Sequence, residues 1–127
     1  MSLADVDPQH FRAALARWAS GVTVVTARYR DEPVAMTASS FSSLSLDPPL
    51  VLVCVAESAH SHEGLVGAPG FTVHVLSRAQ DDLSTRFARW DPGRWDGLQP
   101  DEGPFGEPLL PLGVARLSCA HHMALDG

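Results

Sequence analysis

The chain contains no lysine, few aromatic residues and two cysteines. Its positive charge therefore comes entirely from arginine, whose guanidinium keeps its charge and can bind a phosphate through two hydrogen bonds. The formal net charge of −6, with no basic cluster to offset it, argues against a nucleic-acid-binding surface. No apolar run is long enough for a membrane span, and the first residues lack the basic and apolar regions of a signal peptide. We therefore expect a cytoplasmic protein that binds neither nucleic acid nor a membrane.

The 127 residues suffice for one domain with its own hydrophobic core. Cys54 and Cys119 each lie in an apolar, strand-like setting. Cytoplasmic cysteines of this kind are usually free, so a disulfide between them is the less favoured alternative. We expect two buried free thiols.

Hydrophobic periodicity and turn residues predict several strands and two or three helices. A β-hairpin is expected where two strand-like runs flank the turn at 30–33, and a capping box joins Ser77 to Gln80 at the start of a helix. Helices are expected over 8–19 and onward from Ser77, and a short helix or a turn over 59–67. Strands are expected over 22–27, 34–39, 50–56, 71–76 and 112–124, with 50–56 a central strand and 91–108 a loop.

These elements do not alternate regularly between strand and helix, which argues against a doubly wound parallel sheet. A mainly β fold, an antiparallel barrel with peripheral α-helices, fits the pattern better. The last strand leaves little chain to close such a barrel. We expect its open edge to be covered by a subunit partner or by further chain.

Residues 35–49 are rich in hydroxyl groups and contain no adjacent acid–base partner. Small alcohols beside an apolar strand suit a flat ligand with a polar edge that lies close to the backbone. The alternative is a serine-rich loop that only turns the chain. The hydroxyl side chains are those of Thr37, Ser39, Ser40, Ser42, Ser43 and Ser45.

A second candidate segment, residues 57–62, follows the apolar run and opens a short helix. Its serines and His60 can hold a phosphate at the helix start, whereas the alternative is simple N-capping by Ser58 or Ser61. Arg86 can reach a phosphate or remain a solvated helix charge. A strand histidine such as His74 is more often structural than catalytic.

A metal site is not expected. His121 and His122 are adjacent in a predicted strand, so their side chains point to opposite faces and cannot chelate one ion. No other histidine has a carboxylate or thiolate at a recognisable ligand spacing.

Four blocks of sequence resemble the flavin reductase-like family, the NAD(P)H:flavin oxidoreductases of two-component monooxygenases. The resemblance runs from about Phe11 to Cys119, and its most specific part is Ser39 to Pro49. The blocks are Gly-Val-Thr-Val-Val-Thr at 21–26, Met-Thr-Ala-Ser-Ser-Phe-Ser-Ser-Leu-Ser-Leu-Asp-Pro-Pro-Leu-Val at 36–51, Phe-Thr-Val-His-Val-Leu at 71–76 and Leu-Ser-Thr-Arg-Phe at 83–87.

The resemblance implies a split β-barrel of the FMN-binding type, a homodimer with flavin near the subunit interface, and a possible oxygenase partner. It implies NAD(P)H-dependent reduction of FMN or FAD, with NADH or NADPH as co-substrate; the alternative is a flavin-binding or interaction module without turnover. One domain over 1–127 is expected to lack the family's C-terminal strand or strands, because relatives continue into a Gly-Asp-His motif.

The resemblance also assigns expected roles to individual residues. Thr37, Ser39 and Ser40 are expected to meet the isoalloxazine and ribityl groups, and Ser45 to shape the same wall. The stretches holding Ser58, His60, Ser61 and Arg86 match those that approach the flavin phosphate. His74 stands where relatives often have asparagine.

Overall fold

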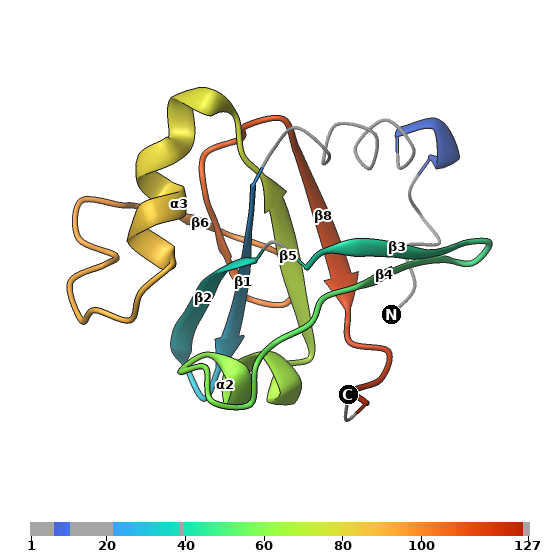
Figure 1. Cartoon of the computed structure of the whole chain (residues 1–127), viewed down its shortest axis with the longest axis horizontal. Helices are drawn as coiled ribbons and strands as arrows, with labels where there is room; N and C mark the ends of the chain where they lie inside the picture. Colours follow the sequence, from blue (N-terminus) through green and yellow to red (C-terminus); the bar gives the residue numbers. More distant parts are fainter. Residues whose placement is uncertain (1–6, 11–21, 39, 126–127) are drawn as a thin grey trace.

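A four-stranded antiparallel sheet in the order β2-β1-β5-β8 forms the centre of the molecule (Figure 1). The computed structural model describes residues 7–10, 22–38 and 40–125. Two further sheets have two strands each, β3-β4 and β6-β7. The central strands are β1 (Thr23–Tyr29), β2 (Glu32–Ala38), β5 (Gly70–Val75) and β8 (Ala115–Ala120).

The predicted hairpin at the start of the sheet is confirmed. β-Branched residues fill the first half of β1, which favours a strand. Arg30 and Asp31 form its two-residue loop and both have positive φ, 53° and 64°, as a type I′ turn requires. The register pairs Tyr29 with Glu32 and runs without interruption to Thr23 opposite Ala38.

The predicted central strand at 50–56 is wrong in extent and in place. β3 (Ser42–Leu46) and β4 (Pro49–Leu52) pair only with each other across the Asp47–Pro48 turn, whose peptide bond is cis. Val51, Val53 and Val55 pack against the core, whereas Leu52 and Cys54 between them are exposed. Only one face of this apolar run is covered, so it lies at the side of the sheet rather than at its centre.

Two hydrophobic clusters lie on opposite faces of the central sheet. One face packs Val25, Val73 and Leu117 against Leu65 of helix α2 (His62–Gly67). The other face packs Val24 and Ala35 against helix α3 (Asp81–Phe87), and a 3₁₀ turn, η1 (Arg78–Gln80), leads into α3. β2 is thus an edge strand with one helix on each of its faces.

The predicted elements near the chain ends are partly confirmed. Residues 8–10 are helical, and the rest of the expected helix at 8–19 lies outside the described residues. The capping box between Ser77 and Gln80 is present, but it opens the 3₁₀ turn before α3. The last strand is shorter than the expected 112–124, and its residues Ala115, Leu117 and Cys119 face one core as predicted.

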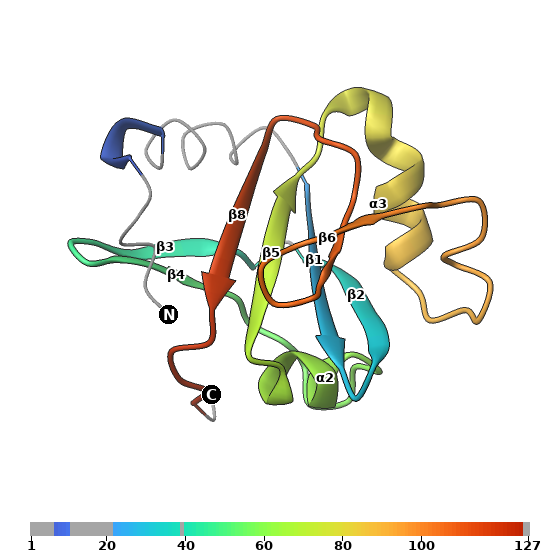
Figure 2. The ribbon, with the colours of Figure 1, turned by 180° about the vertical axis from the view of Figure 1, so that it is seen from behind.

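The segment expected to be a loop at 91–108 is held on the sheet by polar contacts. Strand β6 (Asp101–Glu102) lies in this segment and pairs with β7 (Pro108–Leu109) at its end. Figure 2 shows the segment crossing one face of the central sheet. Thr26 Oγ1 donates to the Pro108 carbonyl at 2.6 Å, and Thr72 Oγ1 donates to the fully buried Glu107 carboxylate at 2.7 Å. These contacts join residues distant in sequence, so no local pattern announces them.

The strand-rich class is confirmed, but among the described residues the central sheet is open and no closed barrel forms. No helix of the described residues is long and apolar enough to cross a membrane. Both cysteines are free, as expected. Cys119 is buried, which raises the pKa of its thiol to about 12. The expectation of a buried Cys54 is wrong, because its side chain lies on the uncovered face of the apolar run.

His74 has the structural role that its strand position favoured. Its Nδ1 donates to the Val24 carbonyl at 3.1 Å, and its Nε2 accepts the Leu110 backbone N–H at 3.1 Å. This pattern requires a neutral ring that carries its proton on Nδ1. Burial lowers the pKa of His74 to about 4, and the Arg116 charge lowers it further while the Val24 hydrogen bond opposes the shift.

The free energy of unfolding is therefore expected to fall by about 3 kcal/mol between pH 6.5 and 4. Over this range the unfolded chain takes up a proton on the histidine and the folded chain does not. Urea unfolding of the wild type and of His74→Asn across these pH values measures the difference. Asparagine does not titrate, so equal pH slopes for the two proteins would contradict the assignment.

Candidate functional site

The outer edge of β2 presents backbone groups that β1 does not pair. Ser61 Oγ donates to the Ala35 carbonyl at 2.9 Å, so the Ala35 carbonyl faces away from β1. Backbone direction alternates along a strand, and the polar groups of Thr37 therefore face the same outer edge. Pro33 also falls in this set, where its missing N–H costs no ladder bond. The result is a short polar edge on the hydroxyl-rich segment.

Two hydroxyl groups fasten the helices on either side of this edge. The buried Ser61 precedes α2 and does not cap it, since its hydroxyl bonds to β2 instead. Thr37 Oγ1 donates to the Ser84 carbonyl of α3 at 2.6 Å. The predicted alternative of N-capping by Ser61 is therefore wrong. Both hydroxyls position the walls around the β2 edge.

His60 and Trp90 meet around the same edge. His60 precedes α2 on one face of the sheet, and Trp90 follows α3 on the other. Their ring centroids lie 4.6 Å apart at an interplanar angle of 46°. The Trp90 side chain remains 52% exposed. This contact joins the two helix-flanking loops and leaves part of the indole open to solvent.

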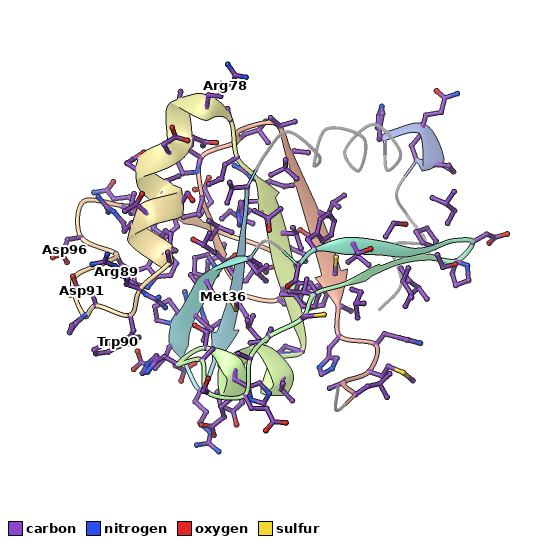
Figure 3. The ribbon with its side chains drawn as sticks, in the orientation of Figure 1. Met36, Arg78, Arg89, Trp90, Asp91 and Asp96 are labelled. Atoms are coloured by element: carbon purple, nitrogen blue, oxygen red, sulfur yellow. The ribbon has the colours of Figure 1, made fainter. Side chains whose placement is uncertain are left out.

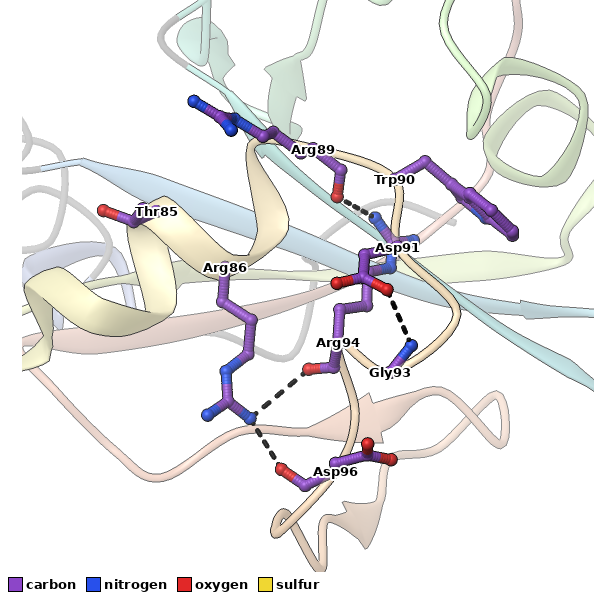
Figure 4. Close-up of a pocket in the computed structure, with 8 residues that line it drawn as sticks. All are labelled: Thr85, Arg86, Arg89, Trp90, Asp91, Gly93, Arg94 and Asp96. Atoms are coloured by element: carbon purple, nitrogen blue, oxygen red, sulfur yellow. Dashed lines mark hydrogen bonds between the residues drawn. The ribbon is translucent and has the colours of Figure 1, made fainter.

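Arg86 lines a cavity of about 450 Å³ between α3 and the loop that follows it (Figure 4). Its Nη1 donates to the Asp96 carbonyl at 2.8 Å and to the Arg94 carbonyl at 3.4 Å. Neither its Nε nor its Nη2 has a hydrogen bond to any described residue. Arg86 therefore holds the loop and keeps donors that an anion can use.

Two more arginines line the cavity. Arg94 is 7% exposed, its guanidinium lies 5.6 Å above the Phe87 ring, and its Nη1 donates to the Arg89 carbonyl at 3.2 Å. Burial lowers the pKa of Arg94. The exposed guanidinium of Arg89 has no hydrogen bond or ion pair within the part of the chain that the structure describes. Figure 3 shows Arg89 and Trp90 at the same end of α3.

Thr37 lies on β2, Ser61 bonds to β2 from the start of α2, His60 precedes α2, and Arg86 lines the cavity beside α3. Ser58 is exposed in the loop before α2. Ser40 is exposed and donates to the Cys54 carbonyl at 2.8 Å, while Ser45 lies half-buried on β3. Figure 1 shows the β3–β4 ladder, which carries Ser45, projecting away from α3. Ser39 lies outside the described residues.

Sequence reasoning did not single out Arg89, Trp90 and Arg94. They lie in or next to a segment that has no periodic signal. A usable signal was present, because three of the nine basic residues fall between positions 86 and 94. Within the described ranges, no three His, Cys, Asp or Glu side chains are placed to hold a metal ion.

Comparisons with known proteins identify the family of this chain. The profile described as "Flavin reductase like domain" matches residues 15–127. The chain is 53% identical to the 4-hydroxyphenylacetate 3-monooxygenase reductase component of Thermus thermophilus, over 92% of this chain and 73% of that protein. It is 45% identical to FMN reductase (NADH) SmoA of Agrobacterium fabrum, over 91% of this chain and 66% of that protein. The chain belongs to the flavin reductase-like family.

Solved structures show the same likeness. Streptomyces globisporus NADH:FAD oxidoreductase SgcE6, in complex with NAD and FAD fragments, matches with a TM-score of 0.77 and 41% identity. The match covers 96% of this chain and 76% of that one. The chain spans about two thirds of the length of the curated relatives it matches, 66% for SmoA.

Arg86→Met is expected to speed backbone amide exchange at Gly93, Arg94 and Asp96 by about tenfold, since a hydrogen bond from a charged group contributes about 1.5 kcal/mol. These amides are bonded within the loop that Arg86 tethers. Hydrogen exchange by mass spectrometry measures the effect. Arg89→Met removes a guanidinium without a described partner and is the matched control. Equal exchange in both variants would show that Arg86 does not hold the loop.

Proposed function

We propose that this protein reduces FMN or FAD with NADH or NADPH and supplies the reduced flavin to a partner monooxygenase. Family membership supports the class of reaction, and the names of the similar proteins supply the two substrates and the oxygenase partner. The observation that carries the proposal is the outer edge of β2, where the outward backbone groups of Thr37 have no hydrogen-bond partner among the described residues.

The residues around this edge fit a flavin. Thr37 is half-buried, and its outward backbone groups suit the hydrogen-bonding edge of a flat ring, with Ser39 and Ser40 next along the chain. Ser58 and His60 are exposed in the loop before α2. The Nε and Nη2 donors of Arg86 have no partner among the described residues, so these three side chains suit the flavin phosphate. Few charge-assisted contacts suit a flavin that must leave after reduction.

When bound, the flavin ring supplies the redox chemistry, accepting a hydride from nicotinamide. The protein's part is then to hold two rings in contact and exclude water. Backbone groups at Thr37 hold the flavin's orientation, and Ser61 and Thr37 fix the walls by bonding to β2 and α3. No acid–base pair is needed for this transfer, which fits a site built from hydroxyls, backbone groups and arginine.

We extend the proposal to a homodimer that completes a split barrel. The projecting β3–β4 ladder exposes Leu44 (61%), Leu46 (46%) and Leu52 (44%). A ladder with apolar side chains on an uncovered face suits burial against a second copy. In such a dimer Ser45 would serve the flavin site of the other subunit, since the ladder that carries it projects away from α3.

A direct assay separates the proposal from a flavin-binding module without turnover. Mixing the protein with NADH and FMN should give saturable, flavin-dependent loss of NADH absorbance. NADPH and FAD replace each partner in turn to rank the substrates. Flavin binding without NADH oxidation would establish the module instead, and absence of both would remove the flavin assignment altogether.

A further inference from the structure

A cavity of about 230 Å³ lies between β8 and residues 97–111, part of the chain that crosses the central sheet in Figure 2. β8 is the edge strand opposite β2, so this cavity is separate from the proposed flavin site. Alternation along β8 turns Ala115 and Leu117 toward the α2 core, and it therefore turns Arg116 to the other face, beside the crossing segment. The apolar residues that line the cavity include Leu98, Pro100, Leu109 and Pro111.

Arg116 has hydrogen-bond donors that the described residues leave unused. Its Nη2 donates to the Leu110 carbonyl at 2.7 Å. Its Nε is buried without a hydrogen-bond partner, and its Nη1 has no partner among the described residues. A donor that is shut away from water without an acceptor is costly, and more so when it belongs to a charged group. The described part of the chain therefore compensates this guanidinium only in part.

The charge of Arg116 also lacks a close counter-charge. Its cross-strand neighbour on β5 is His74, whose ring is neutral. Asp101 lines the same cavity, but it is exposed, and within the described ranges its carboxylate forms no ion pair with Arg116. The cavity thus holds one cation without an ion-pair partner, and the acid that shares its lining faces solvent.

We infer that this cavity binds a small organic monocarboxylate, whose two oxygens accept hydrogen bonds from Nη1 and Nη2 of Arg116. Nη2 has a second N–H besides the one donated to Leu110, so the end of the guanidinium offers two parallel donors that match a carboxylate. The apolar walls suit a short hydrocarbon body. The volume of about 230 Å³ lies below the range of about 300–1,000 Å³ for pockets of larger ligands. Because Asp101 shares the lining, a single negative charge is favoured over the two of a phosphate.

Titration of the isotopically labelled full chain with butyrate at neutral pH, followed by NMR, tests the site without turnover. Saturable changes are expected at the backbone amides of Gly97, Asp101 and Leu110, which line the cavity. Butyramide has nearly the same shape without the charge, and it should leave these amides unchanged. Inorganic phosphate should bind more weakly than butyrate, because its second charge is repelled by Asp101.

Variants assign the binding to Arg116. Arg116→Met should weaken butyrate by about tenfold, because two charge-assisted hydrogen bonds are lost. Arg116→Lys keeps the charge but loses the paired donors, so an intermediate affinity is expected. Arg28→Met is the matched control and should bind butyrate like the wild type, since Arg28 also bonds to the crossing segment, at the Gly106 carbonyl, but does not line the cavity. Asp101→Asn should strengthen butyrate binding by about threefold, because it removes an exposed like charge.

The inference is overturned if butyrate leaves the cavity amides unchanged, if butyramide changes them equally, or if phosphate binds more tightly than butyrate. It is also overturned if Arg116→Met, with unchanged circular dichroism, binds butyrate like the wild type. Should Arg116→Met fail to fold, Asp101→Asn decides, because Asp101 is exposed and has no described side-chain hydrogen bond that the change removes. Unchanged or weaker butyrate affinity in that variant contradicts the site. Flavin takes no part in these measurements, so their failure leaves the proposed reductase function standing.

Discussion

The hydrogen bond from the buried Ser61 hydroxyl to the Ala35 carbonyl fixes the arrangement on which the candidate site depends. It attaches the start of α2 to the outer edge of β2 and leaves the backbone groups of Thr37 facing outward beside it. On the other face, the Thr37 hydroxyl fastens α3. An edge strand is usually a liability for aggregation. Here Ser61 covers the Ala35 carbonyl, and the Thr37 hydroxyl bonds to α3.

Local signals in the sequence were enough for the hairpin, the two helices and the alternating faces of β5 and β8. Turn residues between two strand-like runs, a capping box and strand alternation act over a few residues, and they are readable without the fold. The errors fell where distant segments meet. The apolar run at 50–56 looked central, but its exposure shows one uncovered face, and Glu107 is held by Thr72 across a long stretch of chain.

The candidate site divides in the same way. The hydroxyl run was visible because its residue types are unusual together, and the structure joins Thr37 to α3 and Ser61 to β2. The place of Arg94 depends on its burial and on its contact with Phe87, which no spacing reveals. Trp90 is placed by its ring contact with His60 of another loop, a contact that the sequence does not reveal. Burial and contacts between distant segments of the chain, rather than a sequence motif, distinguish these residues.

The central claim is that a flavin ring lies along the outer edge of β2. Titrating isotopically labelled protein with FMN and following backbone amide resonances by NMR tests it most directly. The amide of Thr37 and those of the segment that follows it should show the largest changes, because they face the ring. Unchanged Thr37 resonances, with the largest changes on β5 and β8 instead, would contradict the account.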